Sequence, residues 1–455
     1  MQNVSARRPA VILPSPDFSI KRLGTPTRPT PMHLSHEDGD YISNFIDDRK
    51  RISQYDDLDT LKSYYDQGID PPSFEAAGPR DTIFFNPKQT RAAIVTCGGL
   101  CPGINDVIRG IVLSLTYNYN VREIFGIRYG YKGLVERHGI EPKRLTPEVV
   151  DHITSLGGTI LGSSRGPQDV GEMVDYMVKH GINLLFTIGG DGTQRGSLAI
   201  ANEVEKRGLH IAVVGIPKTI DNDISYIQRT FGFETAFSVA SEILNNAHAE
   251  AKGANNGVCM VKLMGRHSGF LAATAAVSSG EVNICLIPEV PFDLGPPNGF
   301  LAALEKRVLR RRHAVVVVAE GAGQEHLDLN DENKTDKSGN VVLGDIGTFL
   351  VDKAKKHFVE RKIDASVRYI DPSYIVRSGP ATPNDSMYCL RLAHNAVHAA
   401  MTGRTAMVVG FWHNFFTHIP IEAAVSRRKT VNPEGDLWLS VMETADQPHN
   451  MRNPD

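Results

Sequence analysis

Cysteine is scarce in this chain, with five among 455 residues. An odd and sparse set favours a reduced intracellular protein over a disulfide framework. Cys97 and Cys101 are four residues apart, but no second pair or nearby histidine completes a zinc site. We therefore expect neither disulfides nor structural zinc, and a cytoplasmic location.

Long apolar runs are also lacking, since no stretch approaches the roughly 20 apolar residues of a membrane span. Charge of one sign does not dominate either, because 49 Lys and Arg stand against 52 Asp and Glu, for a formal net charge of −3. This balance argues against bulk binding to nucleic acid or to an anionic membrane. Small anionic ligands need only local positive groups, so they stay open as partners.

Short apolar runs are what the chain does have, and they recur from Arg91 onward with helix-like segments such as 147–156 and 235–251 between them. The runs span 92–97, 123–129, 182–190, 210–217, 257–265, 283–289, 314–321 and 406–412. Strands that alternate with helices at this spacing predict parallel α/β sheets, and the number of strands predicts two domains. Residues 1–88 lack this texture and are expected to wrap or dock. The stretch 325–340 is expected to be a surface loop, and the polar chain after Asn432 is expected to fray.

Ligands of open α/β sheets bind beyond the carboxyl ends of the strands, so the residues after each apolar run are candidates for a site. The first such loop, CGGLCPGIND, carries Gly98, Gly99 and Gly103 at a strand-to-helix turn. Glycines there let backbone N–H groups approach a phosphate, although an ordinary tight turn explains them equally well. The loop matches neither G-x-G-x-x-G nor the Walker pattern.

A second loop, GGDGTQRG (189–196), places Asp191 between glycines. A single carboxylate suits Mg²⁺ beside phosphates, because that ion keeps most of its waters. Gly192 leaves space where a side chain would intrude. The alternative is a glycine turn with a helix-capping Asp or Thr. The pattern also occurs in NAD kinases and diacylglycerol kinases, so it indicates phosphoryl chemistry before it indicates a substrate.

A third loop, GIPKTIDNDISY (215–226), places Lys218, Thr219, Asp221 and Asp223 after a buried strand. A D-x-D pair alone is usually a solvated turn. Beside lysine and threonine it fits phosphoryl transfer, because a carboxylate can accept the proton of an attacking hydroxyl group. Threonine can donate to a phosphate oxygen, and lysine can neutralise the charge that develops on the transferred group. Two carboxylates also allow one to act as the base and the other toward a metal.

Arginines follow three further segments. Arg165 lies in LGSSRGPQD (161–169) and Arg266 in LMGRHSG (263–269), while RYIDPSYIVRSGP (368–380) offers Arg368, Tyr374 and Arg377. Single arginines are mostly surface residues. Together, these could bind a sugar phosphate through paired hydrogen bonds.

In this order, TCGGLCPGIND, GGDGTQRG, PKTIDNDI, KLMGRHSG, VAEG and DPSYIVR resemble the 6-phosphofructokinases over roughly residues 90–425. The long ATP-dependent enzymes of plants and trypanosomatids are most similar. PKTIDND followed some forty residues later by M-G-R gives the resemblance its specificity, since NAD and lipid kinases lack it. The resemblance implies two doubly wound, mainly parallel-sheet α/β domains with the active site between them.

The resemblance also implies boundaries and partners. An N-terminal extension, 1–88, precedes an ATP-binding domain, 89–235, which is completed by about 378–425. The fructose 6-phosphate domain is 236–377, and 426–455 form a tail. A homotetramer and a small-molecule allosteric effector are expected. The bacterial effector site is not carried over, because only Arg109 of its two helix arginines is matched and Leu113 holds the second position.

The implied reaction transfers the γ-phosphoryl group of ATP to the 1-hydroxyl of fructose 6-phosphate, which gives fructose 1,6-bisphosphate and ADP in glycolysis. Asp221 would be the base, with Lys218, Thr219, Asp223 and Arg266 also catalytic. ATP would be held by Gly98, Tyr131, Arg165, Gly166, Gly190, Asp191, Gly192 and Thr193, with Asp191 near Mg²⁺. Fructose 6-phosphate would be held by Thr219, Ile220, Asp221, Met264, Gly265, Arg266, Glu320, Arg368, Tyr374 and Arg377, with Arg368 reaching in from a neighbouring subunit.

Two residues bear on the phosphoryl donor. In this family an Asp in place of Gly192 accompanies pyrophosphate, because its charge occupies the α-phosphate position, so Gly192 favours ATP. Lys218 argues against ATP as the donor, since bacterial ATP enzymes have Gly at this position. The combination occurs in the plant and trypanosomatid ATP group. The alternatives are a pyrophosphate-dependent enzyme, a catalytically silent sugar-phosphate or nucleotide sensor on the same fold, and a GGDGT lipid or NAD kinase.

Overall fold

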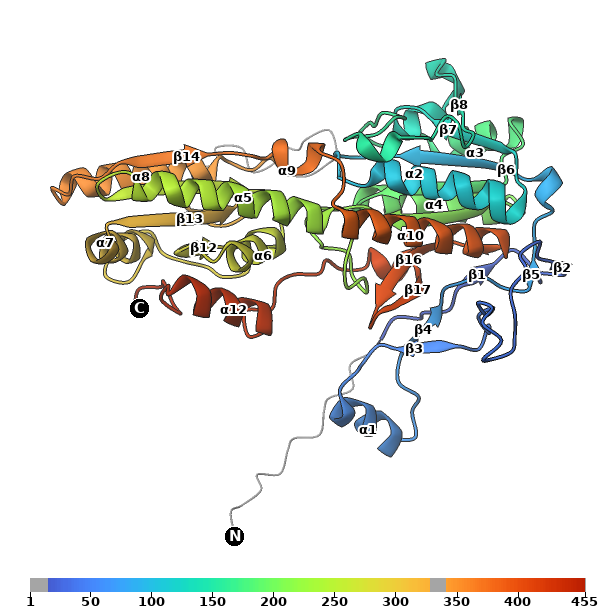
Figure 1. Cartoon of the computed structure of the whole chain (residues 1–455), viewed down its shortest axis with the longest axis horizontal. Coiled ribbons are helices and arrows are strands. Elements are labelled where there is room, and N and C mark those ends of the chain that lie inside the picture. The colour runs from blue at the N-terminus through green and yellow to red at the C-terminus, as the bar shows by residue number, and fades with distance from the viewer. Residues whose placement is uncertain (1–14, 328–340, 455) are drawn as a thin grey trace, which may run out of the picture.

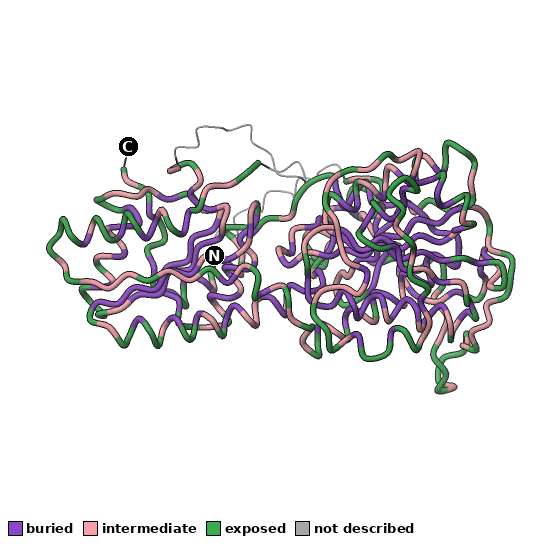
Figure 2. Tube along the Cα trace, turned by 90° about the horizontal axis from the view of Figure 1, so that it is seen from above, coloured by how far each residue is buried: buried purple, intermediate pink, exposed green. Residues whose placement is uncertain are grey.

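Two α/β lobes lie side by side in the structure, a computed structural model that describes residues 15–327 and 341–454 (Figures 1 and 2). A mixed nine-stranded sheet forms the larger lobe and a parallel four-stranded sheet forms the smaller one. The fold class expected from the sequence is confirmed. Within the described residues, no helix is both long and apolar enough to cross a membrane.

The large sheet contains the predicted strands of the first domain and strands from both ends of the chain. Five neighbouring strands, β16, β10, β9, β6 and β7, run parallel, because helices connect them across both faces. The strand order is β3 (Arg51–Ser53), β4 (Ser73–Ala76), β17 (Phe415–Pro420), β16 (Met407–Trp412), β10 (Ala212–Pro217), β9 (Leu184–Gly189), β6 (Arg91–Thr96), β7 (Glu123–Ile127) and β8 (Lys143–Arg144).

Helices cover both faces of the large sheet, so its central strands are apolar throughout instead of alternating. Helices α2 (Ile104–Leu113) and α10 (Pro383–Met401) pack together on one face. Helices α3 (Val170–Lys179) and α4 (Asp191–Lys206) cover the other. Successive residues of β6 accordingly enter different cores, with Ile94 on the α2 side and Val95 on the α3 side.

The small sheet has the order β12 (Ile284–Leu286), β13 (His313–Ala319), β11 (Gly257–Leu263) and β14 (Val367–Ile370). Helices α5 (Phe233–Lys252) and α6 (Phe270–Ser279) cover one face, and α7 (Phe300–Arg311) and α8 (Ile346–Glu360) cover the other. The predicted helix 235–251 is thus confirmed as α5. The short strand β14 went unpredicted, because residues 367–370 include an arginine and a tyrosine and read as neither apolar nor alternating.

Helix α5 also joins the lobes. Its N-terminus is capped by Asp385 of α10, whose Oδ2 accepts the backbone N–H of Gly232 at 2.9 Å and the hydroxyl of Thr235 at 2.9 Å. A carboxylate is favoured there, because it satisfies free N–H groups at the positive end of the helix dipole. The start of α5 is therefore held against the large lobe while its length packs on the small sheet.

The N-terminal segment docks on the large lobe, as expected, and adds strands to it. β4 pairs with β17 and β3 pairs with β4, so both extend the large sheet. β1 (Lys21–Arg22) pairs with β15 (Arg404–Thr405) in a separate two-stranded sheet, and β2 (Arg28–Pro29) pairs with β5 (Thr82–Ile83) within the segment. Glu75 of β4 is buried and accepts bonds from Arg404 and from His418 Nδ1, the latter at 2.9 Å. Burial raises the pKa of the Glu75 carboxyl, but the bonds from His418 and Arg404 outweigh it and hold this pKa well below its usual value. The segment is thus fixed by ion pairs as well as by strand pairing.

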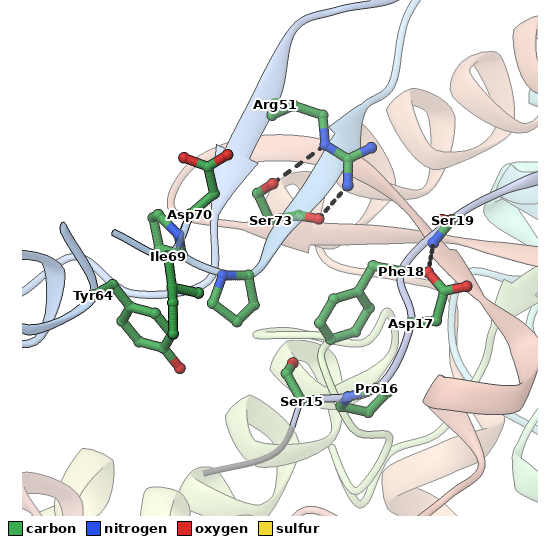
Figure 3. A pocket seen from close by; sticks show the side chains of 12 residues that line it. Ser15, Pro16, Asp17, Phe18, Ser19, Arg51, Tyr64, Ile69, Asp70 and Ser73 are labelled. Carbon is green, nitrogen blue, oxygen red and sulfur yellow. Dashed lines mark hydrogen bonds between the residues drawn. The ribbon is translucent and has the colours of Figure 1, made fainter. Parts of the chain in front are cut away.

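Figure 3 shows a pocket where the N-terminal segment meets β3 and the chain after α1 (Leu58–Asp66). It is lined by residues 15–19 together with Arg51, Tyr64 and Ser73, among others. Arg51 donates to Ser73 across this junction. The pocket contains none of the predicted site residues, so the candidate chemistry lies elsewhere.

Two expectations are wrong. Residues 147–156 do not form an α-helix but turns and one short 3₁₀ segment, Ile153–Ser155. The chain after Asn432 does not fray, because it forms α12 (Asp436–Ala445), which packs on α6. Trp438, Val441 and Met442 share one helical face and bury it. The loop expected at 325–340 lies largely outside the described residues.

Candidate active site

The loop after β10 is held in a single shape by its own side chains. Asn222 adopts a left-handed conformation, with φ of 53°, and its Oδ1 accepts the N–H of Thr230 at 3.1 Å. The Thr230 hydroxyl donates to the carbonyl of Thr219 at 2.7 Å. Asparagine tolerates this backbone region better than most residues. The loop, residues 218–230, therefore presents Asp221 and Asp223 from a rigid base.

Asp221 is the least satisfied carboxylate of this loop. Its Oδ1 is buried without a hydrogen-bond partner among the described residues. Burial raises the pKa of the Asp221 carboxyl, and the charges of Asp223 and Glu320 raise it further, while Lys218 and Arg266 oppose them. A carboxylate that lacks a partner in the folded protein is ready to accept a proton from a bound hydroxyl.

Thr219 links the two aspartates. Its hydroxyl donates to Asp223 Oδ1 at 3.2 Å and accepts the backbone N–H of Asp221 at 3.0 Å. Ser268, on the small lobe, donates to the carbonyl of Asp221 at 3.1 Å. The loop is thereby tied to the segment that carries Met264 to Arg266. The side chain of Ile220 is buried in the core, so only its backbone faces outward.

Lys218 lies beneath the loop after β6. Its Nζ donates to the carbonyl of Gly99 at 2.8 Å, and burial lowers the pKa of its ammonium group. Gly98 is hydrogen-bonded to Ser164, while Ser163 donates to the carbonyl of Gly98 at 2.6 Å. The first glycine loop and the segment around Arg165 and Gly166 are therefore one assembly.

Two arginines lie beside this assembly of loops. A β-carbon built on Gly99 would lie 3.5 Å from a guanidinium nitrogen of Arg165 and 3.5 Å from one of Arg377. Arg377 is on α9 (Ile375–Ser378), between the lobes (Figure 1). Two guanidinium groups over a glycine loop form a strongly positive surface that suits phosphate.

The loop after β9 opens helix α4 with Asp191 in its first turn. Asp191 Oδ2 is 3.0 Å from Arg195 Nε and 4.0 Å from a nitrogen of Arg428. A β-carbon on Gly192 would meet nothing within 4 Å, whereas one on Gly190 would lie 3.3 Å from the carbonyl of Lys218. The helix N-terminus therefore has open space beside a carboxylate, as a nucleotide phosphate with Mg²⁺ would need.

Tyr131 supports this helix from below. Its buried hydroxyl donates to the carbonyl of Thr193 at 2.7 Å and lies 3.0 Å from Ser197 Oγ. Burial raises the pKa of the Tyr131 hydroxyl far above its usual value. Its hydroxyl is thus engaged with α4, and a nucleotide contact by this residue stays a prediction.

The strand ends of the small lobe face the loop of Asp221. Gly265 has a φ of 131°, and a β-carbon there would lie 2.5 Å from the carbonyl of Ser268, so only glycine fits the turn. Glu320 follows β13, where its backbone N–H bonds to the carbonyl of Leu263 at 2.9 Å. Met264, Arg266 and Glu320 are thereby placed next to one another, opposite Asp221.

Known proteins match both the sequence and the fold. The profile of the phosphofructokinase family matches residues 91–400. The ATP-dependent 6-phosphofructokinase of Borreliella burgdorferi is 48% identical over 96% of this chain and 98% of its own length. The chain belongs to the ATP-dependent 6-phosphofructokinase family. It is accordingly a kinase.

Other 6-phosphofructokinases support this membership. The Trypanosoma brucei brucei enzyme is 47% identical over 82% of this chain and 77% of its own, and the chloroplastic enzyme 5 of Arabidopsis thaliana is 46% identical over 82% and 68%. The Pichia pastoris phosphofructokinase crystal structure in the T-state matches with a TM-score of 0.60 at 24% identity, over 85% of this chain and 38% of that one. A pyrophosphate-dependent phosphofructokinase from Marinobacter aquaeolei matches with a TM-score of 0.64 at 18% identity, over 78% and 91%. These two structures show the fold alone.

Of the residues predicted for the phosphofructokinase sugar site, Arg368 lies away from Asp221 and Tyr374 is exposed. Arg368 is exposed on the edge strand β14, where it pairs with Glu250 of α5. Its register partner Cys259 precedes Met264 by five residues, which is about 16 Å along a strand. Tyr374 is exposed, with the guanidinium of Arg377 4.9 Å from its ring. Within one phosphofructokinase subunit, Arg368 therefore does not reach Asp221.

Two residues near this site, His267 and Arg428, are not among those predicted from the sequence. His267, after Arg266, lies near enough to Asp191, Asp223 and Arg428 for their charges to affect its pKa, which burial lowers. Arg428 belongs to residues 426–455, which the sequence predicts to be a tail. Its position between two basic neighbours, Arg427 and Lys429, was the available signal, but a basic run is usually a solvated surface.

The raised pKa of Asp221 predicts a pH effect in this phosphofructokinase. The base must be ionised, so kcat/KM for the sugar phosphate should fall as the pH drops through a midpoint well above the usual Asp range. Asp223→Asn removes a neighbouring negative charge, so the midpoint should move down by about one pH unit. Rate profiles of both proteins measure this. An unchanged midpoint in the variant would contradict the assignment.

Proposed function

We propose that the chain transfers the γ-phosphoryl group of ATP to the 1-hydroxyl of fructose 6-phosphate, with Asp221 as the general base. The observation that carries this proposal is the unpartnered, buried carboxylate oxygen of Asp221 at the carboxyl end of β10. It faces Arg266 and Glu320 of the other lobe. A sugar bound between the lobes would therefore meet the base on one side and a cation on the other.

The loop residues divide the work of the reaction. Asp221 takes the proton of the 1-hydroxyl as its oxygen attacks phosphorus, which moves negative charge toward the transferred group. Lys218 and Arg266 are the cations that neutralise this charge. Thr219 ties the Asp223 carboxylate to the backbone N–H of Asp221 through its two hydrogen bonds. Asp223 tunes the basicity of Asp221, since it raises the pKa of that carboxyl.

The nucleotide would bind with its phosphates over Gly98, Gly190 and Gly192, beside Arg165. Magnesium fits the site as a metal bound by one carboxylate, Asp191, and by the phosphates themselves. The described residues contain no cluster of three or more acidic, histidine or cysteine side chains that could hold a metal without them. When bound, Mg²⁺ supplies charge neutralisation to the phosphate chain.

The substrate site is proposed to be completed by a second subunit. Arg368 is exposed on an edge strand, where it pairs with Glu250, and it is remote from its own Asp221. We infer a homotetramer in which Arg368 reaches the sugar phosphate of an adjacent copy. Light scattering at assay concentrations measures the assembly, and a fully active monomer would disprove it.

We further propose a cytoplasmic enzyme with a small-molecule effector. All five cysteines are free and buried, as in a reducing compartment. Cell fractionation tests the location, and recovery in an organelle fraction would contradict it. Nucleotides and phosphorylated metabolites, screened at low fructose 6-phosphate, test for the effector, and an unchanged rate across that panel would contradict it.

A donor exchange tests the reaction itself. Purified protein is given Mg²⁺ and fructose 6-phosphate with either ATP or pyrophosphate as the sole donor, and fructose 1,6-bisphosphate is measured. We expect turnover with ATP alone, because the space at Gly192 is open and uncharged. Turnover with pyrophosphate alone would overturn the assignment of the nucleotide site, and no turnover with either donor would favour a silent sensor.

A further inference from the structure

The chain that leaves the large lobe passes directly along the loop of Asp221. After α11 (Ile421–Ala424) it crosses to the small lobe and α12, and residues 427–429 are fixed against the loop on the way. Ile224 forms an antiparallel bridge with Arg428, and the backbone N–H of Lys429 donates to the carbonyl of Asp223 at 2.9 Å. We call residues 427–429 the crossing segment.

Lys429 fixes the register of the crossing segment. Its Nζ donates to the carbonyls of Ile227 at 2.7 Å and Gln228 at 3.0 Å, and it lies 5.1 Å from the ring centroid of Phe270. Ser225 adds a bond from its hydroxyl to the carbonyl of Arg427 at 2.9 Å. A segment held at three successive residues cannot slide, so the residue between its anchors has a defined position.

That middle residue, Arg428, extends into the space between the lobes. One of its guanidinium nitrogens is 4.0 Å from Asp191 Oδ2, and its charge lowers the pKa of His267 on the opposite side. Its side chain is 35% exposed, and it has no hydrogen-bond partner in the part of the chain that the structure describes. Arg428 therefore offers free donors between the nucleotide loop and the sugar loop.

Arg195, the other cation beside Asp191, differs in this respect. Its Nε is 3.0 Å from Asp191 Oδ2, and another of its nitrogens donates to the carbonyl of Val425 at 2.6 Å. Arg195 thus pairs with the carboxylate and holds the chain ahead of the crossing segment. Arg195 already balances the negative charge of Asp191, so the positive charge of Arg428, 4.0 Å from the same oxygen, is in excess. An anion in addition to Asp191 would account for it.

We propose that Arg428 binds the γ-phosphoryl group of ATP between Asp191 and Asp221. This assignment rests on the proposed function, since it adds a residue to the same site. Phosphate oxygens that share Mg²⁺ with Asp191 lie within a few ångströms of that carboxylate, which is the distance at which Arg428 already stands. Because Arg428 faces the loop of Asp221, its contact falls on the phosphoryl group that is transferred and not on those that leave with ADP.

Arg428→Gln tests the assignment, with Arg427→Gln as a matched control. Arg427 is exposed, and its guanidinium lies 5.3 Å from the ring of Tyr226. Calorimetry with Mg²⁺ compares the non-hydrolysable triphosphate β,γ-imido-ATP with ADP. In Arg428→Gln we expect about 10- to 100-fold weaker binding of the triphosphate, the range of one charge-assisted hydrogen bond. ADP affinity should change less than about two-fold, and Arg427→Gln should leave both unchanged.

Steady-state kinetics and a conservative variant complete the test. In Arg428→Gln, kcat/KM for ATP should fall by a similar factor with the KM for fructose 6-phosphate unchanged, and Arg428→Lys should recover part of the loss. Equal losses for ADP and the triphosphate, no loss, or tighter Mg²⁺ binding would each overturn the proposal, the last because Arg428 would then compete with the metal. If the wild type bound no β,γ-imido-ATP, the proposed function itself would fail, so the two failures are distinguishable.

Discussion

Asp221→Asn should lower kcat about 10³-fold, the range expected for loss of a general base. Asparagine has nearly the same shape but cannot take the proton of the sugar hydroxyl. The affinity for fructose 6-phosphate, measured by calorimetry, should stay within a few-fold, because a base acts mainly in the transition state. The neighbouring cations Lys218 and Arg266 are kept in this variant.

A stability measurement separates a lost base from a damaged fold. Asp221 Oδ1 is buried without a partner, and burial raises the pKa of this carboxyl, so the ionised form is unfavourable in the folded protein. Asp221→Asn should therefore keep or slightly raise the free energy of unfolding near neutral pH. Asp223→Asn is the control, since it keeps the base and should lose less activity. Wild-type turnover in Asp221→Asn would rule out the base assignment, whereas a large loss of stability would make Asp221 a structural residue.

The sequence predicted the parts of this site that follow buried strands. Eight apolar runs became strands, and the carboxyl ends of β6, β9, β10, β11 and β13 carry the glycine loops, Asp191, Asp221, Arg266 and Glu320. This succeeded because a parallel strand buried on both faces has a continuous apolar signature, and topology then fixes where its end must lie.

Residues that do not directly follow a buried strand could not be predicted in this way. Arg428 is placed by four hydrogen bonds of its neighbours and by its own bridge to a loop some 200 residues earlier in the chain. Helix α12, which follows it, was missed although four of its residues, Trp438, Val441, Met442 and Ala445, are buried. Contacts of this kind depend on how two lobes pack, and no local pattern records them.

Gly192→Asp should change the donor that the enzyme accepts. A β-carbon at this position meets nothing within 4 Å, and an acidic residue in the first turn of α4 suits the helix dipole, so the variant should fold normally. Its carboxylate would stand beside Asp191, in the space where the α-phosphate of ATP is expected. Like charges brought together there cost several kcal/mol, so kcat/KM for ATP should fall by about 100-fold or more.

Pyrophosphate lacks an α-phosphate and would not meet the new charge, and Lys218 is already present beneath the loop at 2.8 Å from the carbonyl of Gly99. Turnover with pyrophosphate should therefore become measurable in Gly192→Asp. Gly192→Ala and Gly192→Asn separate bulk from charge, because alanine adds only a methyl group and asparagine adds size without charge. We expect the ATP rate to fall in the order Ala, Asn, Asp, with pyrophosphate use confined to Asp. An ATP rate within a few-fold of wild type in Gly192→Asp would mean that the α-phosphate lies elsewhere, and the donor would then depend on Lys218 and the arginines over Gly99 instead.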